Sequence, residues 1–180
     1  REAAPDVLHC AHAVLRMLRP QFSARGVNFD LAMAPGGVAA WKGVGDAERL
    51  RRLLYLLVET VLSGAEPGSS LTLRLTDDGD GIRVSVLHSM APAEPGRVGP
   101  GMDSCGARRA AVGGRMRSVK LYCRTLMERW GGAMGENRCP GGWVEHWFRL
   151  LKPEESGMED EVTDAASEPS TVACGGGWGL

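Results

Sequence analysis

The sequence lacks the features by which several common classes of protein are recognised. None of its five cysteines forms a C-x-x-C pair, and their number is odd, so the sequence predicts neither a structural zinc site nor a disulfide framework. No apolar run approaches the length that spans a bilayer. We therefore expect reduced thiols, an intracellular compartment and no membrane contact within this segment.

Basic residues are missing from one end of the chain. Residues 153–180 contain seven acidic residues and no Lys or Arg. The whole chain has a net charge of −1, so residues 1–152 carry +6, which is too small a charge to indicate nucleic-acid binding. The acidic segment also has no apolar period. We interpret residues 1–152 as one domain and residues 153–180 as an acidic disordered tail.

Apolar periodicity predicts helices and strands in alternation over the domain. Helices are predicted near 6–19, 46–64 and 118–130, a strand at 27–33, a hairpin over 69–89, a short strand at 133–136 and a last strand over 141–151. Pro20 kinks or interrupts the first helix, whose continuation ends at Gly26. Asp46 is a suitable N-cap for the second helix. This order predicts an α+β fold of two layers, with helices on one face of a mixed, mostly antiparallel sheet.

Two segments between these elements invite a functional interpretation. The hairpin turn Asp77–Gly81 reads D-D-G-D-G, but the spaced ligands and closing Glu of a calcium loop are absent, so we interpret it as a turn. Residues 91–117 are rich in Gly and have no apolar period, which predicts a long mobile loop. Its arginines are either solvated or contacts for a phosphate or an acidic partner; the candidates are Arg108, Arg109, Arg115 and Arg117.

The order of the elements resembles the ATP-binding domain of sensor histidine kinases, the Bergerat fold shared with gyrase, Hsp90 and MutL. The resemblance covers residues 6–152 and is carried by three segments, 6–31, 45–73 and 121–153. The second, which begins G-D-A-E-R-L-R-R-L-L, matches the family pattern in register. The matching positions are Gly45, Asp46, Arg49, Leu50, Leu54, Leu57 and Leu62.

The nucleotide-binding motifs of that family are not matched. The helix Asn that ligates magnesium falls on Thr60, whose hydroxyl is a poorer ligand for a hard cation. The Asp that reads the adenine amino group falls on His88, and the Gly two residues later falls on Met90, which denies the close backbone approach that Gly permits. The second Gly-rich box falls on Arg117–Lys120, which contains no Gly.

The resemblance therefore implies the C-terminal, ATPase-like domain of a divergent sensor histidine kinase that acts as a pseudo-catalytic signalling module. We assign no catalytic residue and no metal ligand, and expect no cofactor beyond weak binding of ATP with magnesium. The vestigial nucleotide-site positions are Glu59, Thr60, His88, Met90, Arg117 and Lys120. The implied partners are the protein's own upstream dimerisation helices in a homodimer, a response-regulator receiver or another acidic protein. The implied location is the cytoplasm or, alternatively, the plastid stroma.

Two alternatives remain open from the sequence. The first is an active kinase in which Glu59 ligates magnesium and the basic loop binds the phosphates, although the simpler interpretation of Glu59 is that it is solvated or pairs with a nearby Arg. The second is a phosphotransfer scaffold that binds a receiver domain without enzymatic activity.

Overall fold

The computed structural model describes residues 4–34, 41–89 and 102–153, and of residues 102–110 it describes the backbone alone. The elements in chain order are α1 (Val7–Arg25), β1 (Asn28–Met33), α2 (Ala47–Gly64), β2 (Ser70–Asp77), β3 (Gly81–Ser89), α3 (Met102–Trp130), β4 (Ala133–Cys139) and β5 (Trp143–Leu151).

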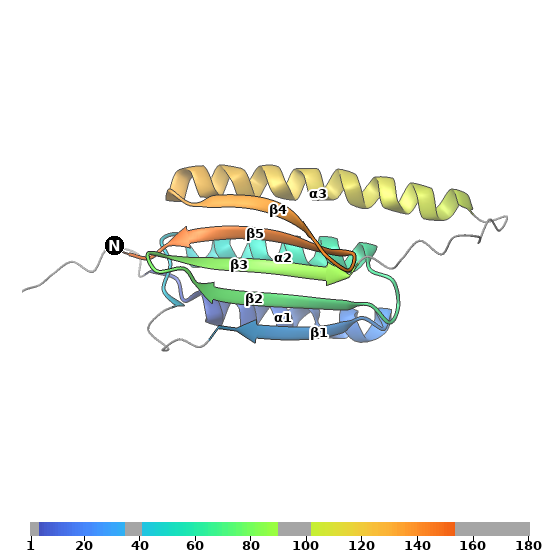
Figure 1. The fold of residues 1–180 in the computed structure, drawn as a ribbon, viewed down its shortest axis with the longest axis horizontal. Coiled ribbons are helices and arrows are strands. Elements are labelled where there is room, and N and C mark those ends of the chain that lie inside the picture. The colour runs from blue at the N-terminus through green and yellow to red at the C-terminus, as the bar shows by residue number, and fades with distance from the viewer. Residues whose placement is uncertain (1–3, 35–40, 90–101, 154–180) are drawn as a thin grey trace, which may run out of the picture.

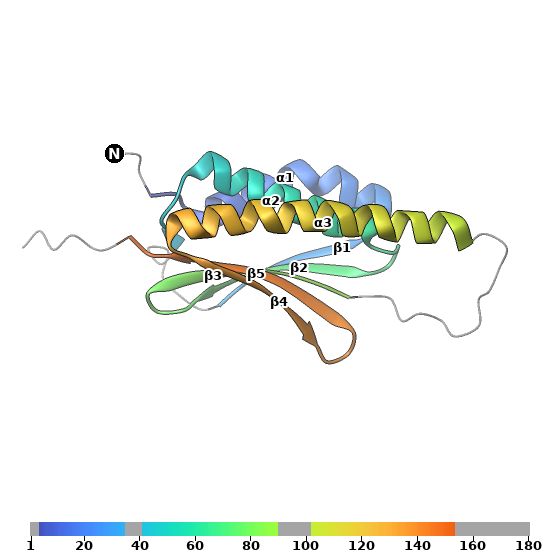
Figure 2. The ribbon, with the colours of Figure 1, turned by 90° about the horizontal axis from the view of Figure 1, so that it is seen from above.

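Three helices cover one face of a five-stranded sheet, and the other face has no helix over it in the described part of the chain (Figures 1 and 2). The strands are ordered β1-β2-β3-β5-β4. β1 and β2 run parallel, whereas the other neighbouring pairs are antiparallel. The predicted fold class, a two-layer α+β arrangement with a mixed, mostly antiparallel sheet, is confirmed.

Local sequence signals explain where the first two helices begin and end. Asp6 and Asp46 each accept a hydrogen bond from the backbone N–H three residues later, at 2.9 and 2.7 Å, which satisfies donors that a helix start leaves unpaired. α1 continues through Pro20 and ends at Gly26, whose left-handed φ of 63° suits a residue without a side chain. The predicted N-cap at Asp46 is therefore confirmed.

The core lies between the helices and the sheet. The apolar stripe of α2 is buried throughout, as its spacing predicts; its members are Leu50, Leu53, Leu54, Leu57, Val58, Val61 and Leu62. Strands β2, β3 and β5 supply the opposing surface, with Leu73, Val84 and Phe148 fully buried. Burying side chains of this size stabilises the fold by about 1.5–3 kcal/mol each before entropy is counted, so this interface fixes how α2 sits on the sheet.

The prediction of a loop up to residue 117 is wrong for residues 102–117, because α3 begins at Met102 and runs 29 residues to Trp130. Gly and Arg in this stretch give no apolar period, but tertiary contacts with α2 compensate. Val112 lies so close to Gly64 that a Cβ on Gly64 would sit 3.1 Å from it, and Arg115 forms an ion pair with Glu59 at 2.9 Å. Residues 90–101 and the tail from 154 onward lie outside the described residues.

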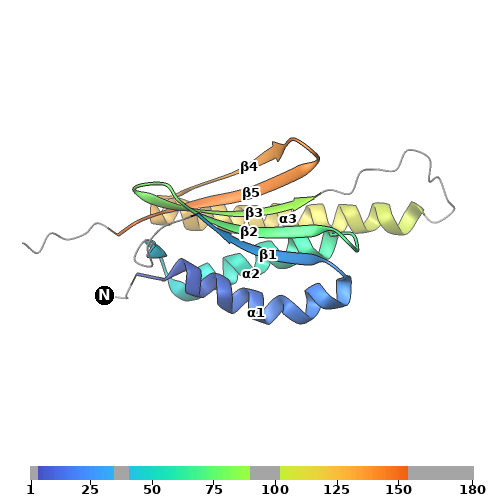
Figure 3. The same ribbon diagram turned by 60° about the horizontal axis from the view of Figure 1, so that its bottom comes forward.

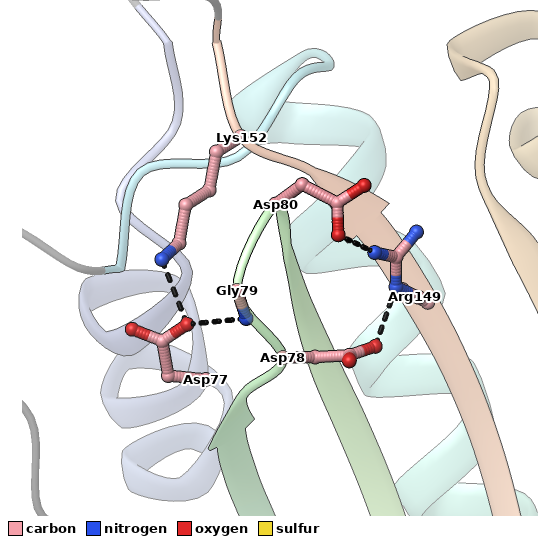
Figure 4. Close-up of polar contacts among 6 residues, drawn as sticks. All are labelled: Asp77, Asp78, Gly79, Asp80, Arg149 and Lys152. Carbon is pink, nitrogen blue, oxygen red and sulfur yellow. Dashed lines mark hydrogen bonds and ion pairs between the residues drawn. The ribbon is translucent and has the colours of Figure 1, made fainter.

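The acidic turn between β2 and β3 closes the hairpin and is held by Arg149 of β5 and by Lys152, which directly follows that strand (Figure 4). Gly79 adopts a left-handed φ of 79°, and its N–H donates to Asp77 Oδ1 at 3.0 Å. Lys152 Nζ contacts Asp77 at 2.7 Å, while Arg149 bridges Asp78 and Asp80. Each of the three carboxylates thus has a cationic partner from the protein, which agrees with the interpretation as a turn rather than a calcium loop.

Candidate functional site

The positions predicted to be vestigial nucleotide contacts come from three elements. Glu59 and Thr60 lie near the end of α2, His88 lies one residue before the end of β3, and Arg117 and Lys120 lie on α3. α2 and α3 lie side by side in two views at right angles (Figures 1 and 2), and their residues contact one another. Met90 lies outside the described residues. Arg108 and Arg109 belong to α3, and their side chains are among those not described.

Thr60, at the position of the magnesium-binding Asn, is a buried residue. Only 1% of its surface is exposed, and its carbonyl accepts a 2.8 Å hydrogen bond from the hydroxyl of Ser63. An Asn that binds a metal–phosphate complex has to reach solvent-filled space, whereas a residue this buried belongs to the packing of α2. The structure thus places this position within the helix layer.

Glu59, the neighbouring residue, is bound to Arg115 of α3. Two nitrogens of the guanidinium face the two carboxylate oxygens, at 2.9 and 3.4 Å. The Glu59 side chain is 18% exposed and that of Arg115 is 56% exposed. The expectation that Glu59 pairs with an Arg is confirmed. Arg115, predicted to lie in a mobile loop, is instead a helical residue with an internal partner, whereas Arg117 is exposed and has no ion pair with a described residue.

The other predicted positions meet in a polar group that we call the histidine cluster: His88 (β3), His146 (β5), Glu136 (β4) and Lys120 (α3). Nε2 of His88 and Nε2 of His146 are 3.4 Å apart. The ring centroids are 5.4 Å apart and the ring planes 13° apart, so the two nitrogens face one another edge to edge. Glu136 Oε2 lies 3.2 Å from Nδ1 of His146 and also binds Lys120 Nζ. The cluster joins all three of these strands to α3.

Burial sets the charge state of the cluster. It lowers the pKa of His88 and lowers the pKa of His146 to about 4, and in His146 the charge of a protonated His88 acts in the same direction. The hydrogen bond from Lys120 lowers the pKa of the Glu136 carboxyl. At neutral pH the cluster therefore contains two neutral imidazoles beside a Lys–Glu ion pair. Nδ1 of His146 is buried and lacks a partner with hydrogen-bond geometry, despite its contact with Glu136.

Glu136 and His146 were not among the residues predicted for the site. The only sequence signal was the alternation of the last strand, which places His146 on the same face as Phe148. The contact between Glu136 and His146 depends on the register of the sheet, because His146 pairs with Val86 on β3 and with Glu136 on β4. His88, which pairs with Val144, reaches His146 diagonally across the strands.

Two of the three described cations at the predicted positions are compensated internally, and Arg117 is the exception. Arg115 has Glu59 and Lys120 has Glu136 as partner. A phosphate ligand would have to compete with these carboxylates for the same donors. Among the described residues, no group of three or more His, Cys, Asp or Glu side chains is placed to hold a metal ion. None of the described helices is long and apolar enough to cross a membrane.

No family model matches the sequence, and no curated protein matches it. Solved structures do share its fold. The nucleotide-free catalytic domain of histidine kinase ThkA matches with a TM-score of 0.59 and 16% identity, over 82% of this chain and 95% of that one. The mycobacterial sensor histidine kinase MprB matches at 0.54 and 18%, over 82% and 96%.

A histidine kinase from Burkholderia phymatum STM815 matches with a TM-score of 0.58 and 23% identity, over 80% of this chain and 68% of that one. ThkA in complex with the response regulator TrrA matches at 0.60 and 14%, over 82% and 41%. The chain thus has the fold of histidine-kinase catalytic domains, and the resemblance inferred from its three sequence segments agrees with these structures.

The buried imidazoles make the stability of the fold depend on pH. In the unfolded chain a His takes up its proton near pH 6.5, whereas His146 in the folded protein does so only near 4. Acidification from 6.5 to 4 therefore favours the unfolded state, by on the order of 2–3 kcal/mol for this residue. We expect His146→Gln to flatten that part of the curve of unfolding free energy against pH.

Urea unfolding at several pH values between 4 and 7.5 measures this effect, with His9→Gln as the control because His9 is exposed. Curves of equal slope for wild type and His146→Gln would contradict the assignment of the acid-sensitive step to the histidine cluster.

Proposed function

We propose that this chain is a histidine-kinase catalytic-type domain that has lost effective ATP binding and acts in two-component signalling as a pseudo-catalytic module. The observation that carries the proposal is the internal use of the groups at the nucleotide positions. Thr60 is buried, Glu59 holds Arg115, Glu136 holds Lys120, and His88 faces His146.

The energetic consequence follows from the ligand's charge. ATP with magnesium is anionic, and its phosphates need donors that are free or only weakly engaged. Here one cation and one carboxylate approach each other at two places, so these two pairs carry no net charge, and Arg117 is left as the uncompensated cation among the described site positions. Each lost charge-assisted hydrogen bond weakens binding by about 1.5–3 kcal/mol, and two such losses reduce the affinity at least a hundredfold.

The proposal disfavours the alternative of an active kinase that uses Glu59 as its magnesium ligand. The carboxylate would have to leave Arg115 before it could ligate a cation, and the freed guanidinium would then repel the same cation. The neighbouring Thr60 cannot take over the role while it remains buried.

For the partner, we propose a response-regulator receiver domain or the chain's own dimerisation helices, within a full-length homodimer. The support is the fold shared with ThkA, which was solved in complex with the response regulator TrrA. Exposed on α3 are Arg117, Leu121 and Arg124, which are spaced by four and three residues and so share one face of the helix. They form a cationic stripe whose apolar centre, Leu121, is 65% exposed. Such a stripe suits an acidic partner surface.

Calorimetric titration with ATP and magnesium tests the nucleotide part of the proposal. We expect no saturable binding at micromolar concentrations, because the cations and carboxylates of the site are paired with each other. The catalytic domain of ThkA, titrated under the same conditions, provides the comparison. A dissociation constant in the low micromolar range would overturn the proposal and favour an active kinase.

The partner part is tested separately with candidate receiver domains and a double substitution, Arg117→Glu with Arg124→Glu. We expect the double variant to weaken receiver binding at least tenfold and to reduce its salt dependence, since exposed ion pairs act mainly in combination. Arg74→Glu with Arg138→Glu, at exposed positions of β2 and β4, is the matched control. Equal receiver affinities for wild type and the α3 variant would exclude this stripe as the docking surface.

A further inference from the structure

A groove lies along the edge of the sheet, away from the histidine cluster. Its lining residues belong to α1, to β1 and to the turn between them. Figure 3 shows α1 below β1, which is the edge strand beside β2. Its volume is about 620 Å³, within the range of pockets that accept ligands or peptide segments. The residues that line it are His12, Leu15, Arg16, Arg19, Phe22, Ser23, Gly26, Val27, Asn28 and Phe29.

Half-buried apolar side chains line the groove beside two exposed cations. The rings of Phe22 and Phe29 pack with centroids 4.8 Å apart, and Leu15 lies partly buried beside the core. Arg16 and Arg19 are exposed, and neither forms an ion pair with any residue in the described ranges. This distinguishes them from Arg115 and Lys120, whose charges are already compensated. The groove therefore suits a segment with both acidic and apolar side chains.

The edge strand adds a second means of recognition. One side of β1 pairs with β2, and no described strand pairs with its other side. Alternate residues of an edge strand point their N–H and C=O groups outward, where an extended segment can add to the sheet. Asp30, the acidic residue of β1, alternates with Phe29 and Leu31 and so projects to the opposite face of the sheet from the groove.

The chain itself contains a segment of matching chemistry. Residues 159–168 read E-D-E-V-T-D-A-A-S-E, so five acids flank Val162 and two alanines, with no cation. We propose that this acidic segment occupies the α1–β1 groove of its own chain, with its carboxylates on Arg16 and Arg19 and its apolar residues over Leu15 and Phe29.

Chain length permits this contact. β5 ends at Leu151, at the same end of the sheet as Gly81 and Asp77. In the strand order, β5 lies three strand spacings from β1. The groove lies at the far end of β1, so the segment has to cross three strand spacings, roughly 15 Å, and the length of β1, roughly 20 Å. About eight extended residues cover the resulting distance, which brings the segment from about residue 161 within reach. A tethered segment also binds at a high effective concentration, so individually weak ion pairs are sufficient.

Hydrogen exchange on the full chain tests the proposal. We expect amides of residues 26–33 and 159–168 to exchange several-fold faster in the double variant Arg16→Glu with Arg19→Glu, and also in wild type at high salt, because both treatments weaken the ion pairs. Adding Glu159→Lys, Asp160→Lys and Glu161→Lys to the double variant restores opposite charges across the groove and should restore the slow exchange. The control is Arg124→Glu with Arg129→Glu on α3, which should leave both segments unchanged.

Each other occupant of the groove gives a different result. If protection of β1 depends on protein concentration, a second copy fills the groove and the proposal is wrong. If the Arg16 and Arg19 variant exchanges like wild type, or if the charge swap restores nothing, the acidic segment does not bind there. Protection of residues 159–168 that is lost only in the α3 control variant would move its binding site to α3.

Discussion

The contact between α2 and α3 determines what this fold can do. α2 packs its whole apolar stripe against the sheet and its neighbouring helices. α3 lies beside α2, with Val112 close to Gly64 and Arg115 in an ion pair with Glu59. In a fold of this kind the space between a helix layer and a sheet is available to a ligand only if the side chains there leave it open. Here α3 supplies cations to carboxylates of α2 and β4, at positions that the proposed function assigns to a lost nucleotide site.

The histidine cluster also limits which groups can enter this region. Its members come from three strands and one helix, and burial keeps both imidazoles neutral. The cost of charging them in place opposes any rearrangement that would bring a proton or a cation to this site. The cluster therefore makes the fold less stable as the pH falls. This region thus combines a tight helix contact, two compensated ion pairs and a neutral histidine pair.

Much of the fold was predictable from the sequence, because the signals were local. Asp46 and the spacing of Leu50 to Leu62 define α2, and the D-D-G-D-G turn defines the β2–β3 hairpin. The first turns of α3 were not predictable, since Gly113, Gly114 and four arginines give no apolar period and the helix depends on contacts with α2. β4 also extends beyond its predicted end, to Cys139, paired with β5. For the site, the departures at Thr60 and His88 were visible in the sequence. The partners Glu136 and His146 required the register of three strands, which no short window of sequence contains.

The central claim is that internal carboxylates hold the cations that a nucleotide would need. The most direct test is the affinity for ATP with magnesium of the double variant Glu59→Gln with Glu136→Gln, which frees Arg115 and Lys120. The control, Glu66→Gln with Glu128→Gln, changes the net charge equally at exposed positions. If the account is right, the first variant binds at least tenfold more tightly than wild type and the control does not. Equal affinities for the two variants, or tight binding by wild type, would contradict it.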